Sequence, residues 1–258
     1  MVQKQKKEQS VEVIENGNIY FCYRPKVETQ NVKGLDDVQR FYMVLRPHGK
    51  QSYRLIVLGQ KQLPDVKHHG EKTWGFVDSV SDSAQQIEQE LREKNYQTKT
   101  RGKREQPTAR PVGEGVYDII RHEDHTHLVY ALELPEDIGP AQKALDIQPE
   151  GSYILSIKNP EKPSPQNAGL SNQQKADLPK QLQKQFEGHR FINANPPEFL
   201  DYSGIELLLI SAASDVSEEL GIELHPEDET EATAEIINDL RMRKSRHPIE
   251  PLLTGQWK

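Results

Sequence analysis

The chain contains a single cysteine, Cys22, which excludes an internal disulfide and any zinc site built from cysteines. It has no apolar run of about eighteen residues, the length that a membrane-spanning helix needs. Residues 1–10 are polar and lack the apolar stretch of a secretory signal, so we expect a disordered leader there. Together these absences predict a soluble, cytoplasmic protein with no membrane partner.

Lysine and arginine are absent from Phe191 to Leu240, a segment that holds thirteen Asp and Glu. The net charge of the whole chain is −7, yet the rest of the sequence has 33 basic and 27 acidic residues. We expect an acidic helical tail over 213–258, with helices at 215–220 and 229–243. It is either a solvated face or a segment that docks through Ile236 and Leu240 and covers basic residues at 99–110.

Sequence motifs that commit to a chemistry are also missing. We find no Gly-x-Ser-x-Gly, no phosphate-binding Gly-x-x-x-x-Gly-Lys and no Gly-x-Gly-x-x-Gly. Cys22 lies in an apolar run, as expected of a buried thiol rather than a nucleophile. The sequence therefore favours a non-enzymatic binding or scaffold protein, with another protein as its partner, over an enzyme.

Short runs of β-branched and aromatic residues predict strands at 18–24, 40–46, 53–60, 74–80, 96–100, 115–122, 126–134, 152–158 and 205–211. Apolar residues at helical spacing predict helices at 84–91, 140–146 and 178–186. Consecutive strands joined by short loops should pair antiparallel. The predicted fold class is therefore α+β with mainly antiparallel sheets.

The first half of the chain resembles the second in the order of its elements. Tyr20 matches Tyr117, Tyr42 matches Tyr130, and Ser52 matches Ser152. This repeat predicts two related β-β-β-α-β modules at 11–105 and 106–212, although coincidence among strand-rich segments would give a similar pattern. The Pro/Gly-bearing connector at 101–113 is the expected boundary.

Three histidines lie close together in the sequence, in the segment 122–127. If 119–121 and 126–134 form a hairpin, alternation puts His125 and His127 on one face. A divalent metal, the one cofactor that the sequence suggests, would have His125 and His127 as ligands, with Glu133 or His122 as the third. This set supports a metal-dependent hydrolase as an alternative function, while solvated histidines at a hairpin tip are the structural alternative.

The connector also carries a basic cluster with a neighbouring aromatic residue, Tyr96. Phosphate groups of a nucleic acid or another polyanion are its natural partners. The residues that would bind them are Lys99, Arg101, Lys103, Arg104 and Arg110. A solvated loop explains the same cluster, so polyanion binding is a second alternative function.

Several stretches are similar to an uncharacterised protein family found in bacteria and fungi. They are Phe21–Val27, Asp36–Pro47, His127–Pro135, Gly151–Pro160 and Leu200–Ile210. Some fungal members carry the label of a BTB-domain transcription factor, but this chain lacks the helical pattern of a BTB domain, so we do not transfer the label. The resemblance implies a shared fold and no particular activity.

Overall fold

The computed structural model describes residues 11–258 except 101, 123, 165–168, 214–215, 217–219, 221–223, 227–228, 231 and 243. No helix in these described ranges is long and apolar enough to cross a membrane. Short 3-10 turns occur at Leu35–Asp37 and Pro197–Asp201. The strands and helices are β1 (Val11–Pro25), β2 (Val38–Pro47), β3 (Tyr53–Leu58), β4 (Lys72–Ser81), α1 (Ala84–Leu91), β5 (Lys94–Thr98), β6 (Gly102–Gln106), β7 (Arg110–His122), β8 (His125–Leu134), α2 (Pro140–Ala144), β9 (Glu150–Lys158), α3 (Lys180–Lys184), β10 (Phe191–Asn193), β11 (Glu206–Ala213), α5 (Glu235–Asp239) and α6 (Glu250–Thr254).

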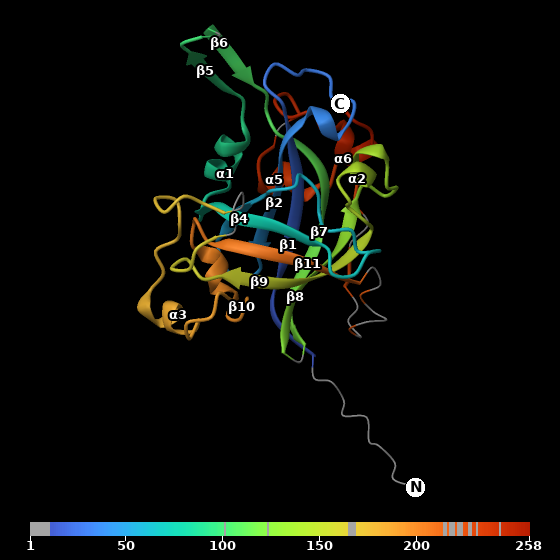
Figure 1. Ribbon diagram of the computed structural model, residues 1–258. Helices are drawn as coiled ribbons and strands as arrows, with labels where there is room; N and C mark the ends of the chain where they lie inside the picture. The colour runs from blue at the N-terminus through green and yellow to red at the C-terminus, as the bar shows by residue number, and fades with distance from the viewer. Residues whose placement is uncertain are drawn as a thin grey trace.

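Nine strands form one antiparallel sheet in the order β10-β9-β11-β4-β3-β2-β1-β7-β8. β8 also pairs with β9, through residues 127–131 and 150–154, so the sheet closes on itself (Figure 1). β1–β4, from the first half of the chain, lie side by side. Strands of the second half flank them, because β1 pairs with β7 and β4 pairs with β11. The prediction of an α+β protein with two modules is therefore wrong. The protein is mostly β, and both halves build the same sheet.

The residue matches between the two halves are wrong as well. Tyr20 points out of the closed sheet, whereas Tyr117 points into it; Tyr42 and Tyr130 differ in the same way. Successive side chains of a strand point to opposite faces, so a match that is wrong by one residue exchanges inside for outside. The matched tyrosines therefore do not occupy equivalent positions.

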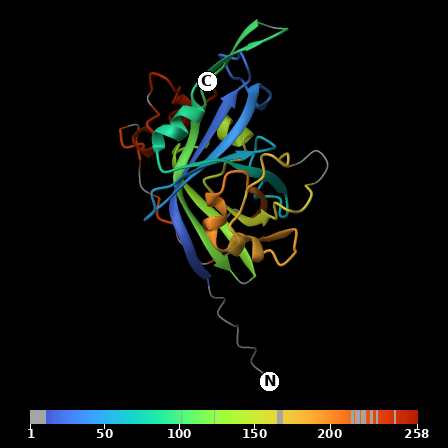
Figure 2. The same ribbon diagram turned by 90° about the vertical axis from the view of Figure 1, so that its left-hand side faces the viewer.

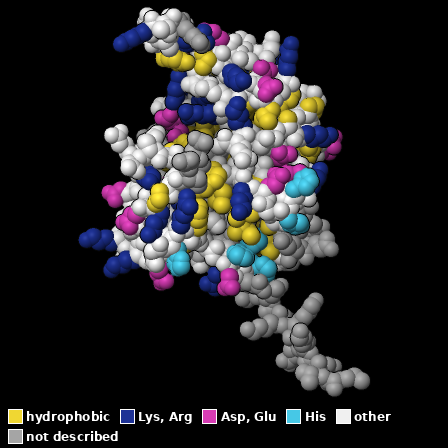
Figure 3. Space-filling view, in the orientation of Figure 1, with side chains coloured by type: hydrophobic (Ala, Val, Ile, Leu, Met, Phe, Trp, Pro, Cys, Tyr) yellow, Lys and Arg dark blue, Asp and Glu magenta, His cyan; other side chains and the backbone are white. Residues whose placement is uncertain are grey.

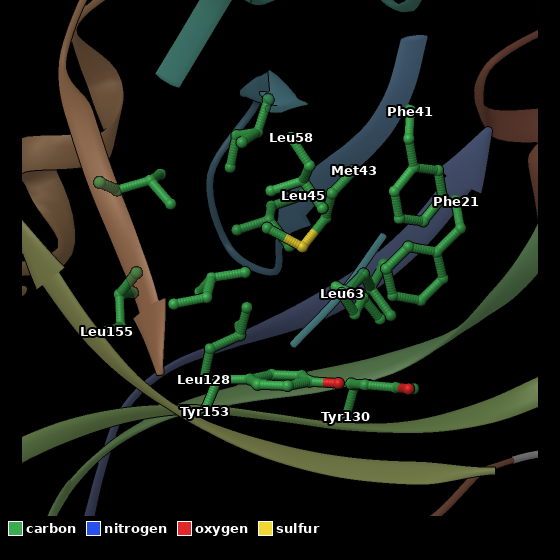
Figure 4. Close-up of a cluster of buried hydrophobic side chains, with 14 of the residues drawn as sticks. Phe21, Phe41, Met43, Leu45, Leu58, Leu63, Leu128, Tyr130, Tyr153 and Leu155 are labelled. Carbon is green, nitrogen blue, oxygen red and sulfur yellow. The ribbon is translucent and has the colours of Figure 1, made fainter. Parts of the chain in front are cut away.

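Side chains that point into the closed sheet form the main hydrophobic core (Figure 4). Phe41, Met43 and Leu45 of β2 alternate inward and are buried. The Phe21 ring of β1 stacks on Phe41 with centroids 6.0 Å apart and meets Tyr130 of β8 edge-on at 5.3 Å. A sheet of this size has an interior just wide enough for side chains to fill, so this centre is a packed core.

The outer face of β1 and β2 is covered by the acidic tail, which docks as one of the two sequence hypotheses expects. Ile236 and Leu240 are fully buried against outward side chains of these strands. The helix is shorter than predicted, because α5 spans only Glu235–Asp239. Asp239 accepts a hydrogen bond from Tyr20 and pairs with Arg46 of β2, so this carboxylate does not face the basic connector. The predicted helix at 215–220 lies largely outside the described residues.

A second sheet of two strands pairs β5, which precedes the basic connector, with β6, which lies within it. This hairpin projects from the upper end of the closed sheet, whereas α5 lies behind the sheet (Figures 1 and 2). The first part of the connector thus belongs to an extended arm, and its last part begins β7 of the nine-stranded sheet. Described tail residues do reach the base of the connector, where His247 Nδ1 lies 2.9 Å from the Thr108 hydroxyl and 2.8 Å from the Ala109 carbonyl oxygen. The β5–β6 hairpin, with Lys99 and Lys103, projects away from the docked tail residues (Figures 1 and 2).

Candidate functional site

One outer face of the closed sheet, formed by β4, β11 and β9, has no described helix packed across its middle, although α1 contacts β4 at one side (Figure 1). Leu208 of β11 lies between Trp74 of β4 and Ser156 of β9, and all three point outward. Hydrophobic side chains gather in the middle of this face, with lysines and arginines on both sides and histidines near its lower edge (Figure 3). The outer faces of β1 and β2, by contrast, lie beneath the tail.

A pocket of about 300 Å³ opens on this face. Trp74 and Phe76 form its aromatic wall. They are two residues apart on one strand, so both side chains leave the same face from positions about 7 Å apart. The pocket is lined mainly by apolar atoms, as small-molecule sites usually are. Its lining residues are Gly59, Gln60, Trp74, Gly75, Phe76, Gly169, Leu170 and Glu206.

A buried ion pair borders the pocket through its lining residue Glu206. Lys158 Nζ is 2.9 Å from Glu206 Oε2, and both side chains are almost completely removed from solvent. Lys158 also donates to the carbonyl oxygens of Asn159 and Lys162. Glu206 accepts further hydrogen bonds from the Ser164 hydroxyl and the Leu170 backbone N–H. Because its oxygens already have donors, Glu206 shapes the pocket and is poorly placed to act as a general base.

A second aromatic ring contacts Trp74 beside the pocket. The Trp74 ring meets the Phe191 ring of β10 edge-on, with centroids 5.7 Å apart. Phe191 pairs with Lys158 in the sheet, so the two rings together extend across β11 and β9. The Arg190 guanidinium lies 5.8 Å from the Phe191 centroid. Trp74 is thus held on one side by Phe191 while contributing to the pocket wall.

The three predicted histidine ligands do come together, at the turn between β7 and β8. His122 lies opposite His125 in the hairpin, and the His127 ring is 6.0 Å from the His122 ring and 6.5 Å from the His125 ring. His127 is buried and hydrogen-bonds through Nδ1 to the Ser152 hydroxyl at 3.1 Å. Burial, with smaller effects of the two neighbouring histidines, lowers the pKa of His127 to about 4.

Glu133, the predicted alternative to His122 as third ligand, lies near the other end of β8 and raises the pKa of Glu114 through its charge. Six residues of strand separate it from His127, a distance of about 20 Å. Among the described residues, no group of three or more His, Cys, Asp or Glu side chains is arranged to hold a metal ion.

The predicted polyanion residues separate into two groups. Lys99, Lys103 and Arg104 lie on the β5–β6 arm, and Arg104 pairs with Glu28. Arg101 lies outside the described residues. Arg110 is buried at the start of β7, where it donates to the Gln30 carbonyl oxygen and stacks over the Tyr23 ring. Arg110 therefore has a role in packing and is not part of the exposed cluster.

The pocket itself was not among the sites predicted from the sequence. The alternation in Trp74-Gly75-Phe76 is the sequence signal that could have indicated two aromatic side chains on one face of a strand. In the predicted strand over 205–211, Ile210 remains partly exposed on the outward side. Lys158 and Glu206 are far apart in the sequence, and only the register of β9 and β11 brings them together.

No family model matches this chain, and searches of the curated proteins and of the solved structures returned no match. The functional conclusion therefore rests on the geometry of the pocket and its surroundings.

Proposed function

We propose that this protein is a non-enzymatic binding protein whose pocket takes a compact, planar and largely apolar group between Trp74 and Phe76. The observation that carries the proposal is the aromatic pocket on the outer face of β4, β11 and β9, across whose middle no described helix packs. The pocket volume of about 300 Å³ suits a ring system or the side chain of a partner rather than a large ligand.

The electrostatics of the pocket support a neutral ligand. The charge of Glu206 is balanced by Lys158 at 2.9 Å, and the donors around both groups are already used within the chain. A ligand with its own net charge would enter a partly desolvated pocket without a free counter-charge, which is unfavourable. Aromatic walls instead favour offset or edge-to-face contacts with another ring.

The test uses the fact that the chain has only two tryptophans, Trp74 and Trp257. Trp257 packs edge-on against Tyr23 at 5.1 Å, away from the pocket, so Trp257→Phe leaves Trp74 as the sole indole reporter. Titration with naphthalene-sized planar compounds should quench Trp74 fluorescence saturably. Saturated ring compounds of equal size should bind more weakly, because they lack the aromatic contact.

Two further variants locate the binding. Phe76→Ala in the Trp257→Phe background should weaken the affinity about tenfold, since it removes one aromatic wall. Tyr96→Ala is the matched control, because Tyr96 is an exposed aromatic residue on the arm. If planar compounds do not quench Trp74, or if both alanine variants have the same effect, the proposed site is wrong.

A further inference from the structure

The β5–β6 arm is a two-stranded hairpin that stands away from the rest of the protein (Figure 2). Residues 94–97 of β5 are all exposed, and its partner strand lies beside it without a third strand on either side. Isolated two-stranded hairpins are marginally stable in water. The arm thus adds little to the core, so its extension has no evident structural purpose.

Positive charge is concentrated toward the tip of this arm. Lys99 and Lys103 are exposed on either side of the turn, and in the described part of the chain neither takes part in an ion pair. Nearer the base, Lys94 and Arg104 form exposed pairs with Glu90 and Glu28. Such surface pairs contribute little stability, so these cations can exchange partners at low cost.

We propose that the arm is a contact element for duplex nucleic acid, with its tip inserted in the major groove and Lys99 and Lys103 on the flanking phosphates. The major groove of B-DNA has the width to admit a two-stranded β-ribbon. Ammonium groups at the ribbon tip then lie near the backbone of the duplex, where they replace condensed counterions.

The charge distribution of the protein supports this placement. The chain as a whole has a net charge of −7, whereas residues 94–106 hold five basic residues and one acidic residue, so a polyanion is attracted to the arm more than to the chain as a whole. The described tail residues dock behind the closed sheet and leave the arm open (Figure 1). Tyr96, which is 42% exposed and lies opposite Arg104, provides an aromatic surface on one side of the ribbon.

The experiment is a fluorescence-anisotropy titration of the full chain with a labelled mixed-sequence duplex over a series of salt concentrations. We expect binding that weakens with salt. A plot of log affinity against log salt has a negative slope. In the double variant Lys99→Ala/Lys103→Ala this slope should be less steep by about 1.8, the value for two lost phosphate contacts. The matched control is Lys180→Ala/Lys184→Ala, which removes the same charge from exposed positions on α3.

The possible outcomes distinguish duplex binding by the arm from a general charge effect and from single-strand binding. Weaker binding of the arm variant alone, with duplex preferred over the corresponding single strand, supports the proposal. Equal losses in the two double variants would indicate only a general charge effect and would overturn it. Absence of salt-dependent duplex binding, or a preference for the single strand, would overturn it too.

Discussion

The Lys158 ammonium and the Glu206 carboxylate are paired at 2.9 Å on the outer face of the sheet, with 0% and 3% of their side chains exposed. A pair on an outer face would normally be solvated. Here the loop that follows β9 closes over it, through the Lys162 carbonyl and the Ser164 hydroxyl. The pair therefore links the loop to the sheet and fixes one edge of the pocket.

Breaking this pair should be strongly destabilising. Lys158→Met leaves the Glu206 carboxylate buried without its counter-charge, and we expect a loss of about 3–5 kcal/mol in the free energy of unfolding. The double variant Lys158→Met/Glu206→Leu removes both charges and should recover most of that loss. Urea unfolding measures both values. A double variant as unstable as the single one would show that the pair is not the source of the effect.

His127 should make the fold sensitive to acid. Burial lowers its pKa from 6.5 to about 4, so the folded state disfavours the charged imidazole. The stability that its neutral form provides is fully present above pH 6.5 and is lost as the pH falls toward 4. The total effect is up to about 3 kcal/mol.

The comparison variant for this prediction is His127→Gln, which keeps a polar group beside Ser152 without the titration. Between pH 7 and 4 it should lose less stability than the wild type in urea unfolding. His68→Gln is the control, because His68 is largely exposed. Parallel pH profiles for wild type and His127→Gln would refute the assignment.

Docking of the tail should depend on pH in the opposite direction. Burial raises the pKa of Glu114 well above its ordinary range, and the nearby Glu229 carboxyl raises it further. The neutral carboxyl accepts the backbone N–H of Ile236 at 2.9 Å. Because the pKa of Glu114 is raised from 4.5 to about 9, this contribution is full below pH 4.5 and is lost progressively as the pH rises through neutrality toward 9.

We therefore expect limited proteolysis within 232–242 to accelerate from neutral to alkaline pH, after correction for the protease's own pH profile. Glu114→Gln should flatten that dependence, since glutamine remains neutral. Ile236→Ala should accelerate cleavage at every pH, because it removes a fully buried side chain. An unchanged pH dependence in Glu114→Gln would exclude Glu114 as the titrating group.

Gly17 of β1 and Gly115 of β7 occupy similar environments. A Cβ atom at Gly17 would collide with the carbonyl oxygen of Arg46, and one at Gly115 with that of Ala131. Each glycine thus allows close approach of the next strand. Gly17→Ala and Gly115→Ala should each cost about 1–3 kcal/mol in thermal or urea unfolding.

Gly34→Ala is the control for these two variants, because nothing lies within 4 Å of a Cβ there and its backbone is extended. It should leave stability nearly unchanged. Equal stability of all three variants would mean that a Cβ atom fits between the strands at Gly17 and Gly115.

These glycines also show why local elements were predictable and the architecture was not. Alternation and apolar spacing are local, so strands such as β2 and helix α1 are confirmed near their expected positions. Pairing of β1 with β7 is not local and could not be read from such patterns. The match of Tyr20 with Tyr117 therefore equated an outward residue with an inward one. The close approach of a neighbouring strand at Gly17 and Gly115 can be recognised only when the strand pairing is known.

The candidate site was hidden for a related reason. Trp74 and Phe76 lie in a predicted strand, but no local pattern says whether their outward face will be covered. The tail covers β1 and β2 and α1 contacts β4 at one side, while the middle of the face formed by β4 and β11 has no described helix packed across it. Lys158 and Glu206 likewise become partners only through the register of two strands.

The most direct test of the central claim is an ¹H–¹⁵N spectrum of the wild-type protein during titration with a planar aromatic compound. The two indole N–H signals, from Trp74 and Trp257, report on the pocket and on a remote site in the same sample. Binding between Trp74 and Phe76 predicts a saturable shift of the Trp74 signal, with the Trp257 signal unchanged. A Trp74 signal that stays fixed, or equal shifts of both signals, would contradict the proposed function.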